Sequence, residues 1–424
     1  MNQLLVVYAF LIPISHRAKS AILVMIILLF IIRGNYIHYL KEAFYNKIVQ
    51  AFLLFLIMNF IWLIGTDNTI HAKSMLDEMK VAIYPLLFIS FLDKKFSFKI
   101  IIAFLAGVLY SEIFSISIFL ELIPPKLEML NYEIYKSLLN DPSPFLSHGR
   151  YSIFLSFAIS LLLYFLINNN NNKYYKVLIT IFIITTAFNI SIIGGRIGYI
   201  AFTLSILFVI ILKYKRRSFK PLLLILFSLS LFFIISFNYS KIFESRINKS
   251  ISSITSLINN DNPNYNTSIG LRIGFWVHSM NVIYDNLLFG VGTGDQMDEV
   301  KNVLTKKHHY ISHLSHPHNE YINVLLQFGL IGFIIFLNIF YQILKYKQEK
   351  YKKNMMLIVS FIISISLISS ILNGKFLFAI FVVLISALIS KKEYISQKYC
   401  TNIRKELVTY IFLIVASLFI SLLQ

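Results

Sequence analysis

The side chains best suited to chemistry lie in a short polar run late in the chain, 316–321, which reads HPHNEY. This run follows a long polar stretch and opens an apolar segment that contains Gly329 and Gly332. Ionisable groups at the mouth of a membrane helix are costly to place there, so they indicate a functional site. Histidine titrates near neutral pH and is the commonest proton acceptor in enzymes. The run therefore predicts a general base.

His318 is the predicted base. Ser315 or His316 is expected to cap a helix and Pro317 suits its first turn, so His318 stands at the start of a helix over 317–344. Such a helix of about 28 residues is roughly 42 Å long, which exceeds the ~30 Å of the hydrocarbon layer. We therefore expect the His318 end to emerge into the outer headgroup region, where a lipid-linked substrate and water meet.

The neighbours of His318 are candidate substrate contacts, namely His316, Asn319 and Tyr321. Asn319 is also expected to orient the ring of His318. A metal site is disfavoured, because side chains two residues apart point to different sides of a helix and few carboxylates lie nearby. We predict that no metal is bound.

Two arginines are predicted to bind an anion. Arg196 follows two glycines in IGGRIG, and Arg272 lies in SIGLRIG. Guanidinium forks match phosphate oxygens, and small neighbours let a diphosphate approach the backbone. The alternative is an arginine that reaches out to the membrane interface. Arg150, which begins another apolar run after SHG, is a weaker candidate for contact with phosphate or sugar.

The glycine-rich run 290–294, GVGTG, only superficially matches a nucleotide-binding loop. It does not follow a strand within a βαβ unit, which that motif requires. We predict instead a tight turn that returns the polar segment to the membrane.

The composition predicts the elements that must position these residues. Of the 424 residues, 57% are hydrophobic and 14% are charged, with a mean hydropathy of +0.71. Soluble domains carry about 25% charged residues, and continuous apolar runs of roughly 17–25 residues suit membrane helices. The fold class is therefore all-α, polytopic, with about twelve spans, or thirteen if the last run is counted. The predicted spans are roughly 4–15, 19–33, 47–65, 78–92, 98–123, 149–167, 177–193, 197–212, 219–237, 317–344, 354–372, 376–390 and 406–423.

The positive charge is distributed as in a membrane protein. Of the 39 Lys and Arg residues, 23 fall in six predicted inner loops, at 33–47, 93–99, 168–176, 213–220, 345–353 and 391–405. This is the positive-inside bias, so the net charge of +19 orients the chain and nucleic acid is excluded as a partner. The interiors of the spans are nearly free of charge.

Three parts follow from this pattern: N-terminal membrane helices over 1–237, an outer segment over 238–316, and C-terminal membrane helices over 317–424. The outer segment is too long for a simple connector. Within it, 272–289 is predicted to form an amphipathic helix at the membrane surface. Its expected apolar stripe is Trp276, Met280, Ile283 and Leu287.

Taken together, these features resemble the O-antigen ligase and polymerase family of bacterial envelope glycosyltransferases. The resemblance covers roughly 145–345 by motif and the whole chain by topology. It rests on His318-Asn319-Glu320-Tyr321 followed by Gly329 and Gly332, on the segment from Arg272 through Trp276 to Gly290-Val291-Gly292, and on Arg196 after an apolar span.

The resemblance implies a multi-pass enzyme of the bacterial inner membrane whose active site faces the periplasm. Such an enzyme transfers a glycan from undecaprenyl diphosphate to a hydroxyl, with no cofactor and no metal. The acceptor is lipid A–core oligosaccharide in a ligase and another lipid-linked repeat unit in a polymerase. His318 matches the family's histidine before Asn, and Arg196 and Arg272 best match its two essential arginines.

We favour the ligase, because the chain is of moderate length with a single large outer segment. A polymerase is the first alternative. A transporter is the alternative from another class, but transporters bind near the bilayer midplane through broken helices and internal repeats. Here the polar residues gather at the outer rim.

Overall fold

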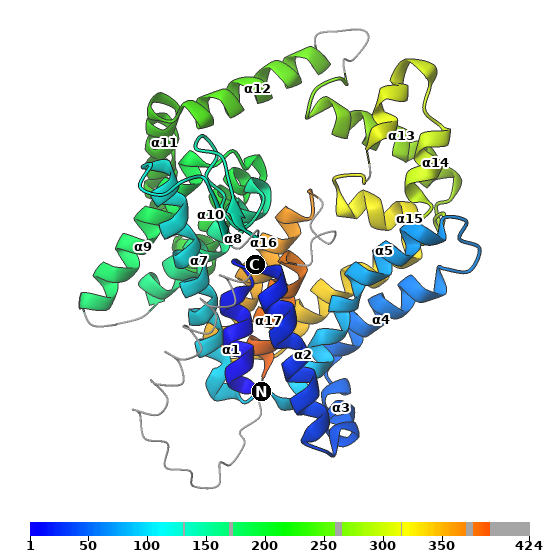
Figure 1. Cartoon of the computed structure of the whole chain (residues 1–424), viewed down its shortest axis with the longest axis horizontal. Helices are drawn as coiled ribbons and strands as arrows, with labels where there is room; N and C mark the ends of the chain where they lie inside the picture. Colours follow the sequence, from blue (N-terminus) through cyan, green and yellow to red (C-terminus); the bar gives the residue numbers. More distant parts are fainter. Residues whose placement is uncertain (130–131, 169–172, 259–264, 315, 370–375, 391–424) are drawn as a thin grey trace.

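A computed structural model of the chain describes residues 1–129, 132–168, 173–258, 265–314, 316–369 and 376–390. This part of the chain is built from α-helices and one small hairpin (Figure 1), which confirms the all-α class. Before the hairpin the helices are α1 (Asn2–Leu11), α2 (His16–Ile32), α3 (Tyr36–Phe44), α4 (Lys47–Ile61), α5 (Thr69–Met79), α6 (Tyr84–Phe91) and α7 (Ser97–Phe119). The hairpin is β1 (Lys126–Met129) with β2 (Tyr132–Lys136).

The remaining helices follow the hairpin. They are α8 (His148–Asn168), α9 (Lys173–Ile192), α10 (Arg196–Tyr214), α11 (Phe219–Tyr239), α12 (Lys241–Ile258), α13 (Gly270–Asp285), α14 (Gln296–Asn302), α15 (Glu320–Lys345), α16 (Lys350–Ser366) and α17 (Leu377–Ile389). Short 3-10 turns lie at Lys80–Ile83, Lys94–Phe96, Lys215–Arg217 and Lys306–His313.

The long apolar helices make the chain a multi-pass membrane protein. Within the described residues, six helices are long and apolar enough to cross a bilayer: α7 with the 3-10 turn before it, α8, α9, α10, α11 and α15. The pair α2 and α3 passes the same test together but is bent by 112°. The predicted runs at 4–15, 47–65 and 376–390 form the shorter apolar helices α1, α4 and α17. Twelve or thirteen spans remain a prediction, and 406–423 lies outside the described residues.

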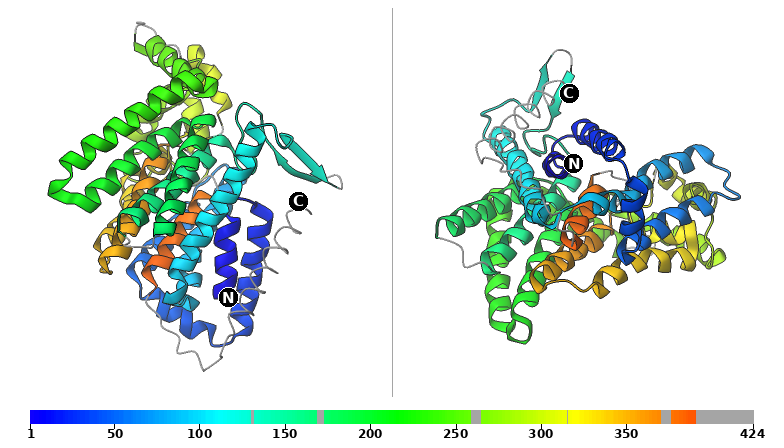
Figure 2. Two further views of the ribbon diagram at one scale, coloured as in Figure 1. Left: turned by 90° about the vertical axis from the view of Figure 1, so that its left-hand side faces the viewer. Right: turned by 90° about the horizontal axis from the view of Figure 1, so that it is seen from below.

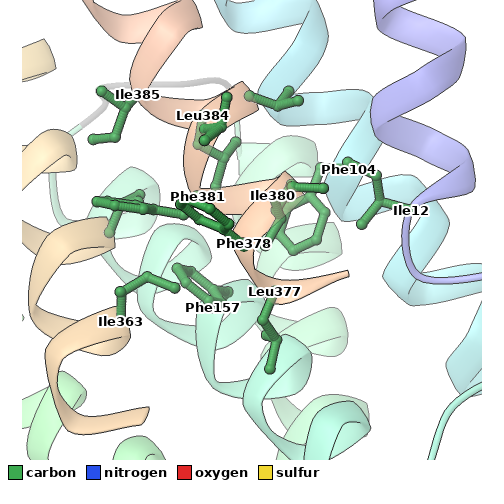
Figure 3. Packing of buried hydrophobic residues seen from close by; sticks show 14 of the residues in the cluster. Ile12, Phe104, Phe157, Ile363, Leu377, Phe378, Ile380, Phe381, Leu384 and Ile385 are labelled. Carbon is green, nitrogen blue, oxygen red and sulfur yellow. The ribbon is translucent and has the colours of Figure 1, made fainter. Parts of the chain in front are cut away.

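Helix α17 lies at the centre of the bundle. All of its 13 residues are buried, as expected for a helix that is apolar on every face. Figure 3 shows its phenylalanines among side chains of other helices, including Phe104 of α7 and Phe157 of α8. Phe381 stacks on Phe340 of α15 with 6.0 Å between ring centroids. Helices α7, α8 and α15 are thus packed against one apolar helix.

Helix α15 differs from the straight helix predicted over 317–344. It begins at Glu320 and is broken at Gly329, whose backbone is left-handed with φ 59°. A Cβ at this position would lie 2.4 Å from the carbonyl carbon of Leu288. The amide of Leu330 instead donates to the carbonyl of Leu287 at 2.8 Å. Glycine is needed here because a second backbone packs against the break.

The glycine-rich run 290–294 packs against this broken helix, as the predicted turn requires. The amide of Val291 donates to the carbonyl of Leu326 at 2.8 Å, and that of Gly292 donates to the carbonyl of Gln327 at 3.0 Å. Buried backbone groups must be paired, and the break in α15 frees these carbonyls for the turn. The segment before α15 is thereby fixed to the membrane helices.

The segment 238–316 forms α12, α13 and α14 between two long helices, and α12 runs across from α11 towards α13 (Figure 1). A helix at the predicted position 272–289 is present as α13. Phe275, Val282 and Ile283 of this helix pack in a second small core, whereas Met280 and Leu287 of the predicted stripe are 47% and 45% exposed. The position of that stripe at the membrane surface stays a prediction.

Candidate functional site

His316 and His318 lie side by side. Their ring centroids are 3.7 Å apart with an angle of 57° between the rings. The prediction that they point to different sides of a helix is wrong, because both precede α15 and are not helical. His318 has a left-handed backbone with φ 54°, a conformation that non-glycine residues adopt at some energetic cost.

The bend that carries the two histidines is held at both ends. Asn319, and not His316, caps α15, and Ser315 lies outside the described residues. The Oδ1 of Asn319 accepts from the amides of Tyr321 at 3.0 Å and Ile322 at 3.3 Å. Before the bend, Trp276 Nε1 donates to the carbonyl of Pro317 at 2.8 Å. Proline is therefore outside the helix, and the rings are positioned by a cap and by an indole of α13.

Both histidines are held in the neutral form. The amide of His318 donates to Nδ1 of His316 at 3.2 Å, which assigns the ring proton of a neutral His316 to Nε2. Burial, with the charges of Arg272 and Arg150, lowers the pKa of His316 to about 4. Burial, with His316 and Arg272, lowers the pKa of His318 to about 3. At neutral pH both rings can accept a proton.

One cavity brings together His316, His318, Arg150 and Arg272. Its volume is about 470 Å³, and Leu377 of the central helix forms part of its wall. These residues come from four separate regions of the chain. The cavity is therefore a product of the fold, and four of the predicted site residues meet in it.

Helix α5 supplies a polar wall of this cavity that the sequence analysis missed. His71, Ser74 and Glu78 line it, and their spacing of three and four residues places them on one helix face. The helix is tied to the glycine-rich turn, because His71 Nδ1 lies 2.7 Å from the carbonyl oxygen of Gly294. The spacing of His71, Ser74 and Glu78 is a pattern in the sequence that could have predicted this polar helix face.

Arg196 lies beside the cavity and does not line it. It begins α10, and its Nη1 donates weakly to Ser268 Oγ at 3.4 Å. The positive charges of Arg246 and Arg272 both act on Arg196, so Arg196 has two other guanidinium groups in its surroundings. Within the described residues, Arg196 and Arg272 form no ion pair, and Arg196 Nε is buried without a hydrogen-bond partner.

Burial disfavours these charges and lowers the pKa of Arg272. Like charges near one another repel. A bound anion that accepts hydrogen bonds from several guanidinium groups would offset this repulsion. The cluster of Arg196, Arg246 and Arg272 can therefore bind a group such as a diphosphate.

Asp141 is a residue that the sequence analysis missed. Its Oδ2 lies 3.1 Å from His148 Nδ1 and 3.4 Å from Arg246 Nη2, and its Oδ1 accepts from the amide of Gly194 at 3.0 Å. Burial alone raises the pKa of Asp141, but these hydrogen bonds and the charges of His148 and Arg246 lower it overall. Asp141 thus joins the segment before α8 to α12 and to the turn before α10.

Asn319 and Tyr321 have structural roles in this arrangement. Asn319 is the helix cap described above, and the Tyr321 hydroxyl donates to the carbonyl of Ser364 on α16 at 2.8 Å. Neither lines the cavity. Their contact with substrate stays a prediction.

Metal-binding side chains are sparse in the described part of the chain. No group of three or more His, Cys, Asp or Glu side chains in it is arranged to hold a metal ion. His278 Nε2 and His308 Nδ1 are 3.0 Å apart and form a separate pair outside the cavity. A reaction without metal stays a prediction for experiment.

An apolar groove of about 600 Å³ lies next to the arginine cluster, between α10, α11 and α12. Tyr199, one turn after Arg196, and Ile247, directly after Arg246, line it. Neither Arg196 nor Arg246 lines the groove itself, but an apolar groove close to guanidinium groups suits a lipid with an anionic head.

The comparison with known families agrees with the sequence analysis. Residues 181–337 match the O-antigen ligase family, which confirms the resemblance stated above. The matched segment includes both histidines and the three clustered arginines, whereas Arg150 and α5 lie before it. No curated protein matches the chain at a significant level.

Proposed function

We propose that this chain, whose residues 181–337 match the O-antigen ligase family, transfers a glycan from undecaprenyl diphosphate to lipid A–core oligosaccharide. One observation carries the proposal: neutral His318 shares a cavity with Arg272, whose charge acts on Arg196, an arginine without an ion pair in the described residues. A base next to an anion site is what transfer from a diphosphate requires.

The donor is positioned by the apolar groove and the arginines. Its polyprenyl chain lies in the groove between α10, α11 and α12, and its diphosphate is held by Arg196, Arg246 and Arg272. When the bond between the sugar and the diphosphate breaks, the electron pair goes to the phosphate oxygen. The guanidinium groups stabilise that developing charge, which is the role a metal often has in such reactions.

His318 removes the proton from the acceptor hydroxyl as its oxygen bonds to the anomeric carbon. The proton moves to the ring and the diphosphate leaves, so atoms and charge balance. In the free enzyme Arg272 helps to keep the pKa of His318 low. Bound diphosphate offsets that charge and raises the pKa of the ring, so His318 becomes a stronger base once the donor is in place.

The cavity is proposed to face the periplasm, together with the segment 238–316. In this arrangement the segment acts as a lid that limits the entry of water, which competes with the acceptor hydroxyl. Thr255, an exposed residue of α12, replaced by Cys in a Cys400→Ser background tests the orientation. Labelling by a membrane-impermeant reagent through a permeabilised outer membrane is expected. Labelling only after the inner membrane is broken contradicts the proposal.

A lipopolysaccharide gel from a deletion strain tests the reaction. A ligase leaves intact core, no ladder and accumulated lipid-linked polymer. Core carrying a single repeat unit shows a polymerase instead, and an unchanged ladder contradicts both.

A further inference from the structure

A second cavity adjoins the one that holds His318. Its volume is about 890 Å³. One wall is the turn between α1 and α2 with the start of α2, where Arg17 lies, and another is the end of β2, with Lys136, and the segment that follows it. Ser147, His148 and Arg150 line both cavities, so the two spaces meet at the start of α8. Nothing in the proposed donor site uses the second cavity.

We propose that this second cavity binds an acidic or phosphorylated oligosaccharide, the part of the acceptor that carries the reacting hydroxyl. The inference rests on the proposed function. The lining has the chemistry of a saccharide site: the half-buried Phe145, backed by Tyr135, offers a ring, and Ser137 and Ser143 offer hydroxyl groups. Rings pack against the apolar faces of sugars, and hydroxyl groups pair with sugar hydroxyls.

The charge of the lining favours an anionic saccharide. Arg17, Lys136 and Arg150 contribute positive charge. Among the lining residues that the structure describes, Asp141 is the one acid, and it is already engaged by His148 and Arg246. The remaining positive charge has no described acid opposite it within the cavity, so phosphate or carboxylate groups on a glycan complement it.

The position of the cavity favours the acceptor over the donor. The proposed donor groove lies against α11 and α12, whereas the second cavity lies against the turn between α1 and α2. Figure 2 shows α1 and α2 on one side of the bundle and α11 and α12 on the other. An acceptor that enters from the α1 side reaches His318 past Arg150, while the diphosphate is held from the α10 side.

The wall of the cavity is fixed in place. Tyr135 is buried and its hydroxyl donates to the carbonyl of Pro124 at 2.9 Å. Its ring packs edge-on against Phe114 of α7 and against Phe145. Asp141 holds the same segment to Gly194. The site is therefore formed before a ligand arrives, which reduces the entropy lost on binding.

Charge reversal at the rim tests the proposal. Arg17→Glu and Lys136→Glu, singly and together, are compared with Lys126→Glu. Lys126 is a matched control because it lies on the same hairpin, pairs with Glu128 and is absent from the lining. The proteins are purified in lipid nanodiscs. The probes are deacylated, phosphorylated core oligosaccharide and the same oligosaccharide after phosphatase treatment.

Two readouts separate this inference from the proposed function. In binding, the wild-type protein and Lys126→Glu are expected to prefer the phosphorylated probe, and the double variant is expected to lose that preference. In transfer, the KM for the acceptor is expected to rise roughly tenfold in the double variant, whereas the KM for the donor does not.

Equal binding of both probes by the wild-type protein, or an unchanged KM for the acceptor in the double variant, overturns the inference and leaves the proposed function intact. A rise in the KM for the donor alone also overturns it, because the cavity then holds the donor glycan. If the wild-type protein transfers no glycan, the proposed function fails. The binding measurement then still tests whether the second cavity prefers the phosphorylated oligosaccharide.

Discussion

Two polar regions lie inside this apolar bundle, and they differ in how completely their polar groups are paired. In the first, Glu112 of α7 is fully buried. Its carboxylate accepts from the hydroxyl of Thr186 at 2.7 Å and from that of Thr185 at 3.1 Å. The prediction that the span interiors are nearly free of charge misses this residue. Buried polar groups that are paired in this way join helices.

The second region is the cavity of His318 and Arg272 with the arginines beside it. There Arg196 Nε is buried without a hydrogen-bond partner, and the positive charges of Arg246 and Arg272 act on Arg196. Arg246 pairs with Asp141, but in the described residues no ion pair balances the charge of Arg196 or Arg272. The carboxylate of Glu112 is therefore satisfied by hydrogen bonds within the protein, whereas we expect the charges of Arg196 and Arg272 to be balanced by a bound anionic ligand. Mutations should therefore affect stability in the first and activity in the second.

The largest expected effect is that of His318→Ala. Loss of a general base lowers transfer by about 10²–10⁴-fold, so the lipopolysaccharide ladder should disappear while the protein is expressed at a normal level. His313→Ala is the matched control, because His313 is exposed and absent from the cavity lining. A near-normal ladder from His318→Ala contradicts the assignment of the base.

The next effect in size is that of Arg196→Lys and Arg272→Lys. An ammonium group keeps the charge but does not reproduce a bidentate fork, so transfer should fall by roughly 10²-fold. The control is Arg33→Lys, at an arginine that lies over the ring of Tyr39 away from the cavity. Normal transfer by both site variants favours simple anchoring at the membrane interface.

A smaller effect is expected on the pH dependence. The pKa of His318 in the folded protein lies below its ordinary value of 6.5, and kcat/KM reports the free enzyme. Activity should therefore fall only well below pH 6.5. Arg272→Gln removes a positive charge that lowers this pKa, so the residual activity should fall at a higher pH. If the activity of both the wild-type protein and Arg272→Gln falls with a midpoint at pH 6.5, the pKa of His318 is not lowered by burial and by Arg272.

The same shifts act on stability. Both histidines bind protons less readily in the folded protein than in the unfolded chain, whose pKa is near 6.5. Stability should therefore be complete above pH 6.5 and decrease as the pH falls from 6.5 towards 3. Thermal unfolding of the purified protein at several pH values measures this decrease.

The smallest effect on activity is expected from Glu112→Ala. Removing the carboxylate leaves a void and breaks two hydrogen bonds, which should lower the free energy of unfolding by about 2 kcal/mol. The hydroxyl of Thr186 also donates to the carbonyl of Phe182, which limits the cost. Transfer per folded molecule should be unchanged within error. A loss of transfer as large as that of His318→Ala would contradict the claim that Glu112 contributes to stability and not to activity.

Sequence reasoning found those parts of the site whose residue types stand out in an apolar chain. His318, Arg272 and Arg150 were predicted in this way and meet in one cavity. Asp141 and Arg246 were missed because their roles depend on packing between distant segments. Gly194 is an example: a Cβ at this position would lie 2.5 Å from Arg246 Nε. The residues around Gly194 in the sequence do not indicate that Arg246 packs there.

The fold, like the candidate site, was predicted from the sequence only in part. The apolar runs predicted the helices of the bundle, and the glycine-rich run 290–294 predicted a turn. The break at Gly329 was not predicted, because apolar periodicity continues through it. It depends on the segment around Leu287, which pairs with the backbone on the far side of the break. Likewise, the position of His318 outside α15 follows from the Asn319 cap.

The most direct test of the central claim is transfer by the purified protein in lipid nanodiscs, with an undecaprenyl diphosphate-linked glycan, lipid A–core acceptor and excess EDTA. We predict that labelled glycan appears on the acceptor at the same rate with and without EDTA, and that none appears with His318→Ala. Complete loss in EDTA that magnesium or manganese restores, or full transfer by His318→Ala, would contradict the claim that a histidine and arginines alone carry out the reaction.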